Sequence, residues 1–218
     1  PGEGEPLPLA LGTRHGVVKR WNRESPTTMD SWSIIDLKDG DELLTAREAD
    51  DGDRVVFVSS DSSLLTFDAK LVRPQGRTAA GMAGIRLAEG CTVLTCAIVP
   101  AAQVAWHEAQ TDDQGAVTEA AHGAVVLTVA GDADALPGTE NGSAKLTPFS
   151  LYPTKGRATG GVRSQRFLKG QNTLVKAYVG DYPLVACTEH GHPVALPQPD
   201  MRRDGSGTEL TAPITYVA

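Results

Sequence analysis

An internal repeat constrains the fold of this chain more strongly than any other feature of its sequence. The segment "LAEGCTVLTCAIV" matches "FLKGQNTLVKAYV" in register, and Gly90 and Gly170 of the two copies lie 80 residues apart. A third copy, "LKDGDELLTA", lies 50 residues before the first. Self-similarity at a period of this size is typical of solenoids and propellers, in which each repeat is one supersecondary unit.

Two further elements recur beside this one. "QGRTAAGMAG" and "KGRATGGVRS" are also 80 residues apart, and "MRRDGSGTEL" is a looser copy, so that Arg77, Arg157 and Arg203 align. "TRHGVVKR" aligns with "SDSSLLTF", which places Gly16 opposite Ser63, 47 residues later. "TEHGHPVAL" is the last copy of this element. The chain therefore divides into four units of about 50 residues.

Each unit is predicted to contain four strands. Its pattern reads strand, tight turn, strand, basic glycine-rich loop, strand, turn and strand, and apolar runs such as Val55–Val58 and Val125–Val129 mark the strands. We expect an all-β, propeller-like disc, because each blade buries one face only against its neighbours. The expected blades are residues 8–50, 53–99, 123–179 and 181–218, with an acidic inter-blade segment at residues 100–122.

Charge is unevenly distributed along this acidic chain. The sequence has 27 Asp and Glu against 20 Lys and Arg, for a net charge of −7. Residues 100–142 hold seven acids and no Lys or Arg, whereas residues 154–180 hold six Lys and Arg and no acid. Because local potential matters more than net charge for binding a polyanion, the basic segment is a candidate binding surface. Solvated surface loops are the alternative interpretation.

Other classes of protein are disfavoured by what the sequence lacks. No apolar run approaches the roughly 18–20 residues of a membrane span. The three cysteines lack the spacing of a zinc site, and no GxSxG, HExxH or Walker sequence occurs. We therefore expect no membrane association and no metal. The chain begins at Pro1 without a signal-peptide pattern, so we expect it to be a piece of a longer protein.

The repeats resemble a known family. Val17–Arg20, Pro74–Leu87 with Gly90, and Gly156–Val179 are similar to the repeated pattern of the C-terminal domain of the A subunit of bacterial type IIA topoisomerases, gyrase and topoisomerase IV. The similarity covers essentially the whole chain. It implies a β-pinwheel of four-stranded blades that exchange strands with their neighbours, and a basic rim that binds and bends duplex DNA beside the cleavage core.

The resemblance also implies what lies outside this chain. In the family the catalytic tyrosine, the metal-binding acids and the ATPase belong to other parts of the enzyme, so we expect no catalytic residue and no cofactor here. The implied partners are duplex DNA, the ATPase B subunit, and the remainder of the A subunit. The implied location is the cytoplasm, at the nucleoid.

The candidate DNA contacts are cations of the repeated loops and of the first hairpin. A DNA-wrapping surface needs cations at a repeated height, because the duplex carries about one charge per 1.7 Å of axis. Arginine can bind phosphate through two nitrogens, and glycine lets the backbone approach it. The expected contacts are Arg77, Lys155, Arg157, Arg163, Arg166 and Arg203, then Arg73, Arg86 and Lys169, and on the hairpin Arg14, Lys19 and Arg20. The alternative is that a recurrent arginine ties blades together through carbonyl groups or an acid.

The loop sequences bear on the kind of topoisomerase. Gyrase pinwheels carry the heptapeptide Gln-Arg-Arg-Gly-Gly-Lys-Gly, and its equivalents here, "PQGRTAAG" and "TKGRATGG", do not match it. The first unit has "WNRESPTTMD" at this place, without glycine. Degenerate loops favour topoisomerase IV over gyrase, and a topoisomerase of mixed type stays open.

Two other functions compete with DNA binding. A propeller-type scaffold for protein interactions is favoured by the net charge and by the acidic stretch. A propeller enzyme would need carboxylates that converge on a central pocket, whereas the residues in register here are mainly basic, so it ranks last. Duplex binding that weakens steeply with salt distinguishes DNA binding from the scaffold.

Overall fold

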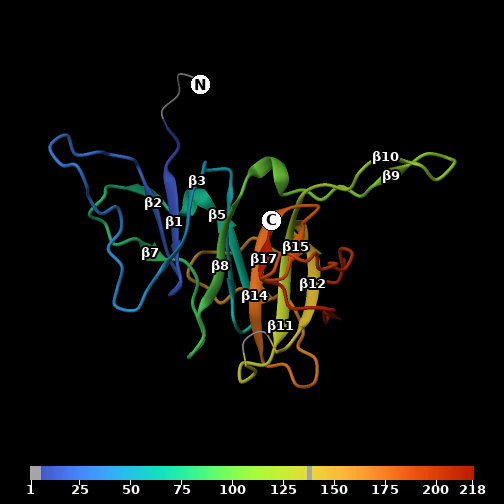
Figure 1. Cartoon of the computed structure of the whole chain (residues 1–218). Helices are drawn as coiled ribbons and strands as arrows, with labels where there is room; N and C mark the ends of the chain where they lie inside the picture. Colours follow the sequence, from blue (N-terminus) through green and yellow to red (C-terminus); the bar gives the residue numbers. More distant parts are fainter. Residues whose placement is uncertain (1–5, 137–138) are drawn as a thin grey trace. The chain divides into compact units, whose positions relative to one another are not determined.

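The computed structural model describes residues 6–136 and 139–218, which form strands, turns and three short 3-10 helices (Figure 1). By its contacts the chain divides into two compact units. Of the described residues, unit 1 comprises those within Pro1–Ser59, Leu65–Ala101 and Thr154–Gly161, and unit 2 those within Ser60–Leu64, Ala102–Pro153 and Val162–Ala218. Among the described residues, no helix is long and apolar enough to span a membrane.

Unit 1 is built on two sheets. The first has the order β3-β1-β2-β6, and β7 also pairs with β2. Its strands are β1 (Leu9–Thr13), β2 (Val17–Trp21), β3 (Leu43–Glu48), β6 (Pro74–Gln75) and β7 (Met82–Ala83). In the second sheet β4 pairs with β8 on one side and with β5 on the other. These strands and the helix after β5 are β4 (Arg54–Ser59), β5 (Ser63–Asp68), η1 (Ala69–Leu71) and β8 (Val93–Val99).

Unit 2 is built on a four-stranded sheet of order β14-β11-β12-β16 and two small antiparallel pairs, β9-β10 and β15-β17. The main strands are β11 (Ala124–Gly131), β12 (Ser143–Pro148), β14 (Thr173–Asp181) and β16 (Thr208–Glu209). The small pairs are β9 (Gln110–Thr111), β10 (Val117–Glu119), β15 (Ala186–Cys187) and β17 (Tyr216–Val217). The remaining elements are η2 (Ala101–Gln103), η3 (Phe149–Leu151) and β13 (Val162–Arg163).

Each unit has its own apolar core. In unit 1, the rings of Phe57 and Phe67 stack with centroids 6.3 Å apart inside a cluster of buried aliphatic side chains. In unit 2, every residue of β11 is buried, and Trp106 meets Tyr182 edge to face at 5.3 Å. Continuous apolar runs in β4 and β11 therefore belong to strands that are covered on both faces.

The repeats are joined by strand exchange, in which the loop of one repeat completes the hairpin of the repeat before it. Val18 in β2 pairs with Met82 in β7, and within unit 2 Leu64 pairs with Val162 and Ala144 with Thr208. The 80-residue offset between the loops holds here, since Met82 and Val162 take equivalent places. These pairings define which residues of the repeats are equivalent.

The pairings correct one alignment. Val18 and Leu64 are equivalent, so the hairpins of the first two repeats are offset by 46 residues, and Gly16 corresponds to Ser62 instead of Ser63. The physical reason is the tight turn. Gly16 and Ser62 both have positive φ, at 83° and 70°, immediately before the second strand of the hairpin. The sequence alignment missed this because serine rarely adopts that conformation.

Gly16 is required by a close approach between two segments of unit 1. Its carbonyl accepts hydrogen bonds from the amides of Gly84 at 2.7 Å and Ile85 at 3.2 Å. A Cβ added at Gly16 would lie 2.8 Å from Ile85 Cγ2 and 3.0 Å from Ile85 O. A side chain here would therefore push the exchanged segment away from the hairpin.

We predict that Gly16→Ala destabilises the chain more than Gly90→Ala. Both glycines have positive φ, 83° and 74°, so each substitution adds about 1 kcal/mol of backbone strain. A Cβ at Gly90 meets no atom within 4 Å, whereas at Gly16 it clashes with Ile85, which adds at least about 1 kcal/mol more. Urea unfolding of the two variants measures the difference, and equal destabilisation would contradict the packing argument.

Candidate nucleic-acid interface

Three segments, called the rim loops below, carry most of the predicted cations: residues 73–86, 154–166 and 201–207. The first loop lies in unit 1, and the third in unit 2. The second loop begins in unit 1 and continues into unit 2 after Gly161. Their positions follow from the strand exchange, because β7, β13 and β16 lie in these loops or directly after them.

In unit 1 the first two rim loops are hydrogen-bonded to each other. The amide of Ala158 donates to Gly84 O at 2.7 Å, and the amide of Arg86 donates to Thr159 O at 3.0 Å. Arg157 is half-buried, and its Nη1 donates to Ala83 O at 2.6 Å. The exposed predicted cations of these loops in this unit are Arg73, Arg86 and Lys155, and Arg77 is half-buried.

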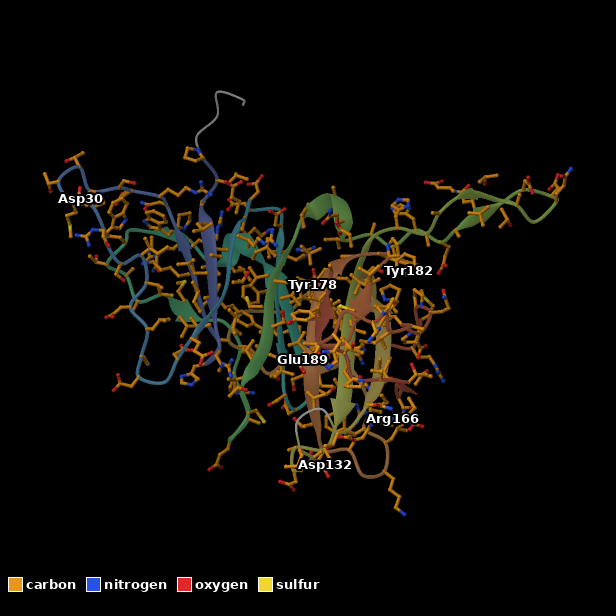
Figure 2. The ribbon with its side chains drawn as sticks, viewed as in Figure 1. Asp30, Asp132, Arg166, Tyr178, Tyr182 and Glu189 are labelled. Carbon is orange, nitrogen blue, oxygen red and sulfur yellow. The ribbon has the colours of Figure 1, made fainter. Side chains whose placement is uncertain are left out.

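In unit 2 the second and third rim loops meet in the same way. The amide of Arg166 donates to Gly205 O at 3.0 Å, and the Arg166 side chain is exposed (Figure 2). Arg163 is exposed and forms an ion pair with Asp204 at 3.6 Å. Lys169 is exposed and Arg203 half-buried.

The first hairpin contributes one exposed cation. Arg14 lies in the turn after β1 and forms an ion pair with Glu42 at 2.8 Å. Exposed pairs of this kind contribute little to stability, typically below about 1 kcal/mol, so the Arg14 and Arg163 side chains can exchange their carboxylate partner for another anion.

Lys19 is not a surface cation, and its prediction as a DNA contact is wrong. Its side chain has 0% exposure, and Nζ donates to Ile34 O at 2.7 Å, Arg77 O at 2.8 Å and Ala79 O at 2.6 Å. Its burial lowers its pKa. The prediction failed because β2 is an inner strand of its sheet with both faces covered, so alternation along the strand exposes neither face.

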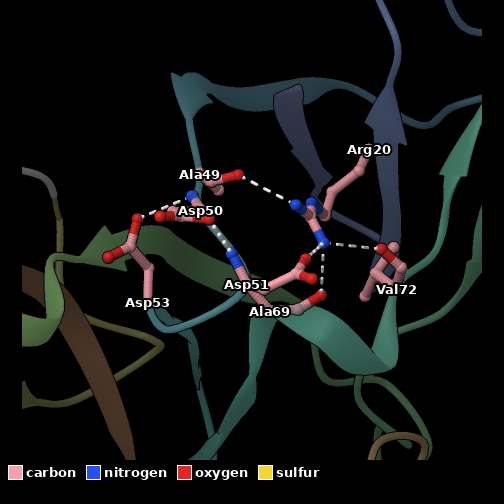
Figure 3. A network of polar contacts seen from close by, with 7 residues as sticks. All are labelled: Arg20, Ala49, Asp50, Asp51, Asp53, Ala69 and Val72. Atoms are coloured by element: carbon pink, nitrogen blue, oxygen red, sulfur yellow. Dashed lines mark hydrogen bonds and ion pairs between the residues drawn. The ribbon is translucent and has the colours of Figure 1, made fainter. Parts of the chain in front are cut away.

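Arg20 is buried as well, at 2% exposure, and is also wrongly predicted as a DNA contact. Figure 3 shows its guanidinium surrounded by oxygens of unit 1. Nη1 donates to Asp51 Oδ1 at 2.6 Å, Ala69 O at 3.1 Å and Val72 O at 3.2 Å, and Nη2 donates to Ala49 O at 3.0 Å. Arg20 therefore ties three segments of unit 1 together.

Lys145 is a functional candidate that the sequence analysis missed. It lies in β12 with 2% exposure, and its Nζ donates to Thr147 Oγ1 and, at 2.9 Å, to Arg203 O. Burial lowers its pKa to about 8, although Asp200 and Asp204 act in the opposite direction. The available signal was the equivalence of "GSAKL" with "GVVKR", in which a lysine follows the turn glycine by three residues.

The acidic segment forms an exposed hairpin. Every residue of β9 and β10 is exposed, and the hairpin stands out from the other strands of unit 2 (Figure 1). At its base, the rings of His107 and His122 stack with centroids 4.4 Å apart, and the two residues exchange backbone hydrogen bonds. The acids of this hairpin are thus displayed to solvent.

We predict that Arg20→Met lowers the free energy of unfolding by about 2–4 kcal/mol, because it removes the buried guanidinium that donates to the carbonyls of Ala49, Ala69 and Val72, of which, among the described residues, only Ala69 O keeps a backbone donor, the amide of Val72. The matched control is Arg47→Met, which removes the same charge from an exposed position on β3 and should change stability by less than about 0.5 kcal/mol. Denaturant unfolding measures both, and similar values would contradict the structural role of Arg20.

Lys145 predicts a pH dependence of stability. Its folded-state pKa of about 8 lies below the ordinary value of 10.5, so between these values the unfolded chain binds more protons than the folded chain. Stability conferred by this site therefore rises with pH across that window, by up to about 1.4 kcal/mol per pH unit. The free energy of unfolding of the unsubstituted chain minus that of Lys145→Met should increase from pH 8 to 10, and a flat difference would contradict it.

Comparison with known proteins finds similarity to the A subunit of DNA gyrase and to its C-terminal domain. The family described as DNA gyrase C-terminal domain, beta-propeller, matches residues 53–100 and 138–180. The DNA gyrase A protein of Staphylococcus epidermidis is 26% identical over 211 residues, which cover 95% of this chain and 20% of that protein. Its counterpart from Staphylococcus aureus is also 26% identical over 211 residues, covering 95% of this chain and 21% of that protein. The chain thus spans about a fifth of the length of these relatives.

Solved structures share the fold. The C-terminal domain of DNA topoisomerase IV has a TM-score of 0.72 at 17% identity and covers 99% of this chain, which in turn covers 62% of it. The DNA gyrase A C-terminal domain has a TM-score of 0.65 at 18% identity, with coverages of 99% and 66%. The predicted all-β pinwheel is confirmed by these neighbours. Together with the family model that matches part of the chain and with the gyrase A relatives, they confirm the predicted resemblance to the C-terminal domains of gyrase A and topoisomerase IV.

Proposed function

We propose that this chain is the accessory domain of a type IIA topoisomerase A subunit that binds and bends duplex DNA through its rim loops. One observation carries the proposal. Arg86 and Arg166 are exposed and lie 80 residues apart at equivalent places, and the amide of each donates a 3.0 Å hydrogen bond to the following rim loop, at Thr159 O and Gly205 O. The fold therefore repeats an exposed arginine on a fixed backbone.

This arrangement suits phosphate better than base edges. Within residues 6–136 and 139–218, the guanidinium groups of Arg86 and Arg166 form no hydrogen bond or ion pair, so both are available to an anion. Lys155 in the second rim loop and Lys169, three residues after the end of that loop, add exposed ammonium groups. Contacts of this kind position DNA without reading its sequence. An aromatic content of 5% offers few platforms for stacking bases, which favours duplex over single-stranded DNA.

The resemblance to topoisomerase A subunits suggests which functions belong to other parts of the enzyme. We propose that the catalytic residues and the ATP-dependent step lie outside this chain and that it needs no cofactor of its own. In this proposal it works at the nucleoid, in the cytoplasm, together with the ATPase B subunit, and with the remainder of the A subunit. The degenerate loop sequences favour a topoisomerase IV-like role over gyrase-like wrapping. Four blades with the boundaries predicted from the sequence are part of this proposal.

A protein-interaction scaffold is the second candidate function. The exposed hairpin of β9 and β10 favours it, because Asp112 and Asp113 in its tip and Glu119 at its end are exposed to solvent and give the hairpin a negative charge that suits a basic partner. In that case the rim loops would not need to bind DNA, and the two candidates differ in their response to duplex and salt.

We predict that the chain binds a 30-base-pair duplex with micromolar or tighter affinity and that the affinity falls steeply as salt rises. Arg86→Glu and Arg166→Glu should each weaken binding by about tenfold at low salt, because each replaces a phosphate contact with a repulsive charge. The matched control is Arg47→Glu, which makes the same charge change on β3, outside the rim loops. Fluorescence anisotropy titrations at several salt concentrations measure all four proteins.

Two outcomes would contradict the proposal. Affinity independent of salt, or equal losses for the rim and control variants, would remove the rim loops as the DNA contact. Bending is tested separately by the rate at which ligase circularises short duplexes with and without the chain. Binding without faster circularisation would leave a DNA-binding domain that does not bend DNA.

A further inference from the structure

The buried lysines Lys19 and Lys145 each donate a hydrogen bond to the backbone carbonyl oxygen of an arginine, at equivalent positions of two different rim loops. Lys19 Nζ donates to Arg77 O at 2.8 Å in unit 1, and Lys145 Nζ donates to Arg203 O at 2.9 Å in unit 2. Each lysine therefore fixes the backbone of the arginine that recurs at the same place in its loop. The two lysines are 126 residues apart, and so are the two arginines.

Strand pairing establishes that these contacts are equivalent. Val18 pairs with Met82 and Ala144 with Thr208, so hairpin and exchanged strand shift together by 126 residues between the first and third repeats. In the second repeat Leu64 pairs with Val162, which puts Leu65 at the place of the lysine. Leu65 is fully buried in the apolar core of unit 1.

The second repeat also differs in its loop arginine. Arg157, the equivalent of Arg77 and Arg203, donates from Nη1 to Ala83 O at 2.6 Å. By contrast, the guanidinium groups of Arg77 and Arg203 form no hydrogen bond or ion pair with the described parts of the chain. Where a lysine fixes the loop, the arginine side chain is left available, and where leucine replaces the lysine, the arginine itself is bound to the protein.

Stability of the sheet alone does not explain why lysine occupies positions 19 and 145. An ammonium group loses its hydration when buried, and the hydrogen-bond partners of Lys19 and Lys145 include no carboxylate. Leu65 fills the equivalent place in the same kind of sheet without that cost. What the lysine adds over leucine is a fixed loop carbonyl.

We propose that Lys19 and Lys145 are positioning residues that hold the Arg77 and Arg203 backbones so that their guanidinium groups face DNA phosphate, whereas Arg157 is a structural residue. This inference rests on the proposed DNA-binding function. A loop that is ordered before binding loses less conformational entropy when it contacts the ligand, which increases affinity without a new contact. Neither lysine touches DNA, since both are buried.

The test is a double-mutant cycle on the folded chain, with Lys145→Met, Arg203→Gln and both together. Removing one phosphate contact should reduce the slope of log affinity against log salt by about 0.9 and weaken duplex binding roughly fivefold. We expect each single variant to show these changes and the double variant to add little, because the lysine acts through the arginine. Arg157→Gln should leave the salt slope unchanged.

Lys176→Met is the control for the loss of a lysine whose ammonium group donates to a backbone carbonyl, although Lys176 is half-buried. Lys176 lies in β14 of the same unit, and its Nζ donates to Thr215 O at 2.7 Å, away from any rim-loop arginine. Its removal should leave the salt slope unchanged. If Lys145→Met does not fold, the cycle of Lys19→Met with Arg77→Gln makes the same measurement in unit 1.

The outcomes separate the inference from the function on which it rests. If the unsubstituted chain binds no duplex, the proposed function fails and the positioning role fails with it. If the chain binds duplex but Lys145→Met keeps the full salt slope, or if the effects of Lys145→Met and Arg203→Gln add, the lysine is only structural. A loss of slope in Arg157→Gln equal to that in Arg203→Gln would overturn the assigned difference between the arginines.

Discussion

The rest of this structure depends on strand exchange, in which a short strand from one repeat completes the hairpin of the repeat before it. β7 covers the edge of β2, β13 that of β5 and β16 that of β12. An uncovered edge would expose a row of backbone donors and acceptors to other chains. Two residues within each of the first two rim loops, and the two residues directly after the third, are fixed in this way, so each loop occurs at the same place in its repeat. The regular display of cations is thus a consequence of satisfying backbone hydrogen bonds.

The buried cations extend the same principle to side chains. Arg20, Lys19 and Lys145 each reach from a hairpin strand to carbonyl oxygens of loops that make no regular ladder of their own. A cation surrounded by several carbonyls keeps its hydrogen bonds, which offsets part of the cost of removing it from water. Hydrogen bonds depend on direction and distance more strongly than apolar contacts do, so these contacts hold a loop in one conformation.

Much of the fold was predictable because its repeats preserve turn glycines and apolar strands. The 80-residue offset located two rim loops and their arginines, and the strand runs at Val55–Val58 and Val125–Val129 lie in β4 and β11. The predictions that failed were those that depended on which side chains are buried. Lys19 and Arg20 read as exposed hairpin cations, although β2 is covered on both faces, and a sequence does not reveal which faces its neighbours cover. The sequence alignment did not match Ser62 to Gly16, because the two residues share a positive φ and not a residue type.

Because the sequence does not reveal which cations are buried, the number of charges alone does not predict DNA binding. Of the predicted cations, Lys19 and Arg20 are buried, Arg157 is bound to a carbonyl, and Arg14 and Arg163 face carboxylates. Salt screens exposed charges beyond about 8–10 Å, so the acids of the β9–β10 hairpin act only on their surroundings and the net charge of −7 does not decide affinity. In the proposed function, affinity then depends on how well each remaining cation is held in place. If the chain binds DNA as proposed, the contribution of this fold is the positioning of charges more than their number.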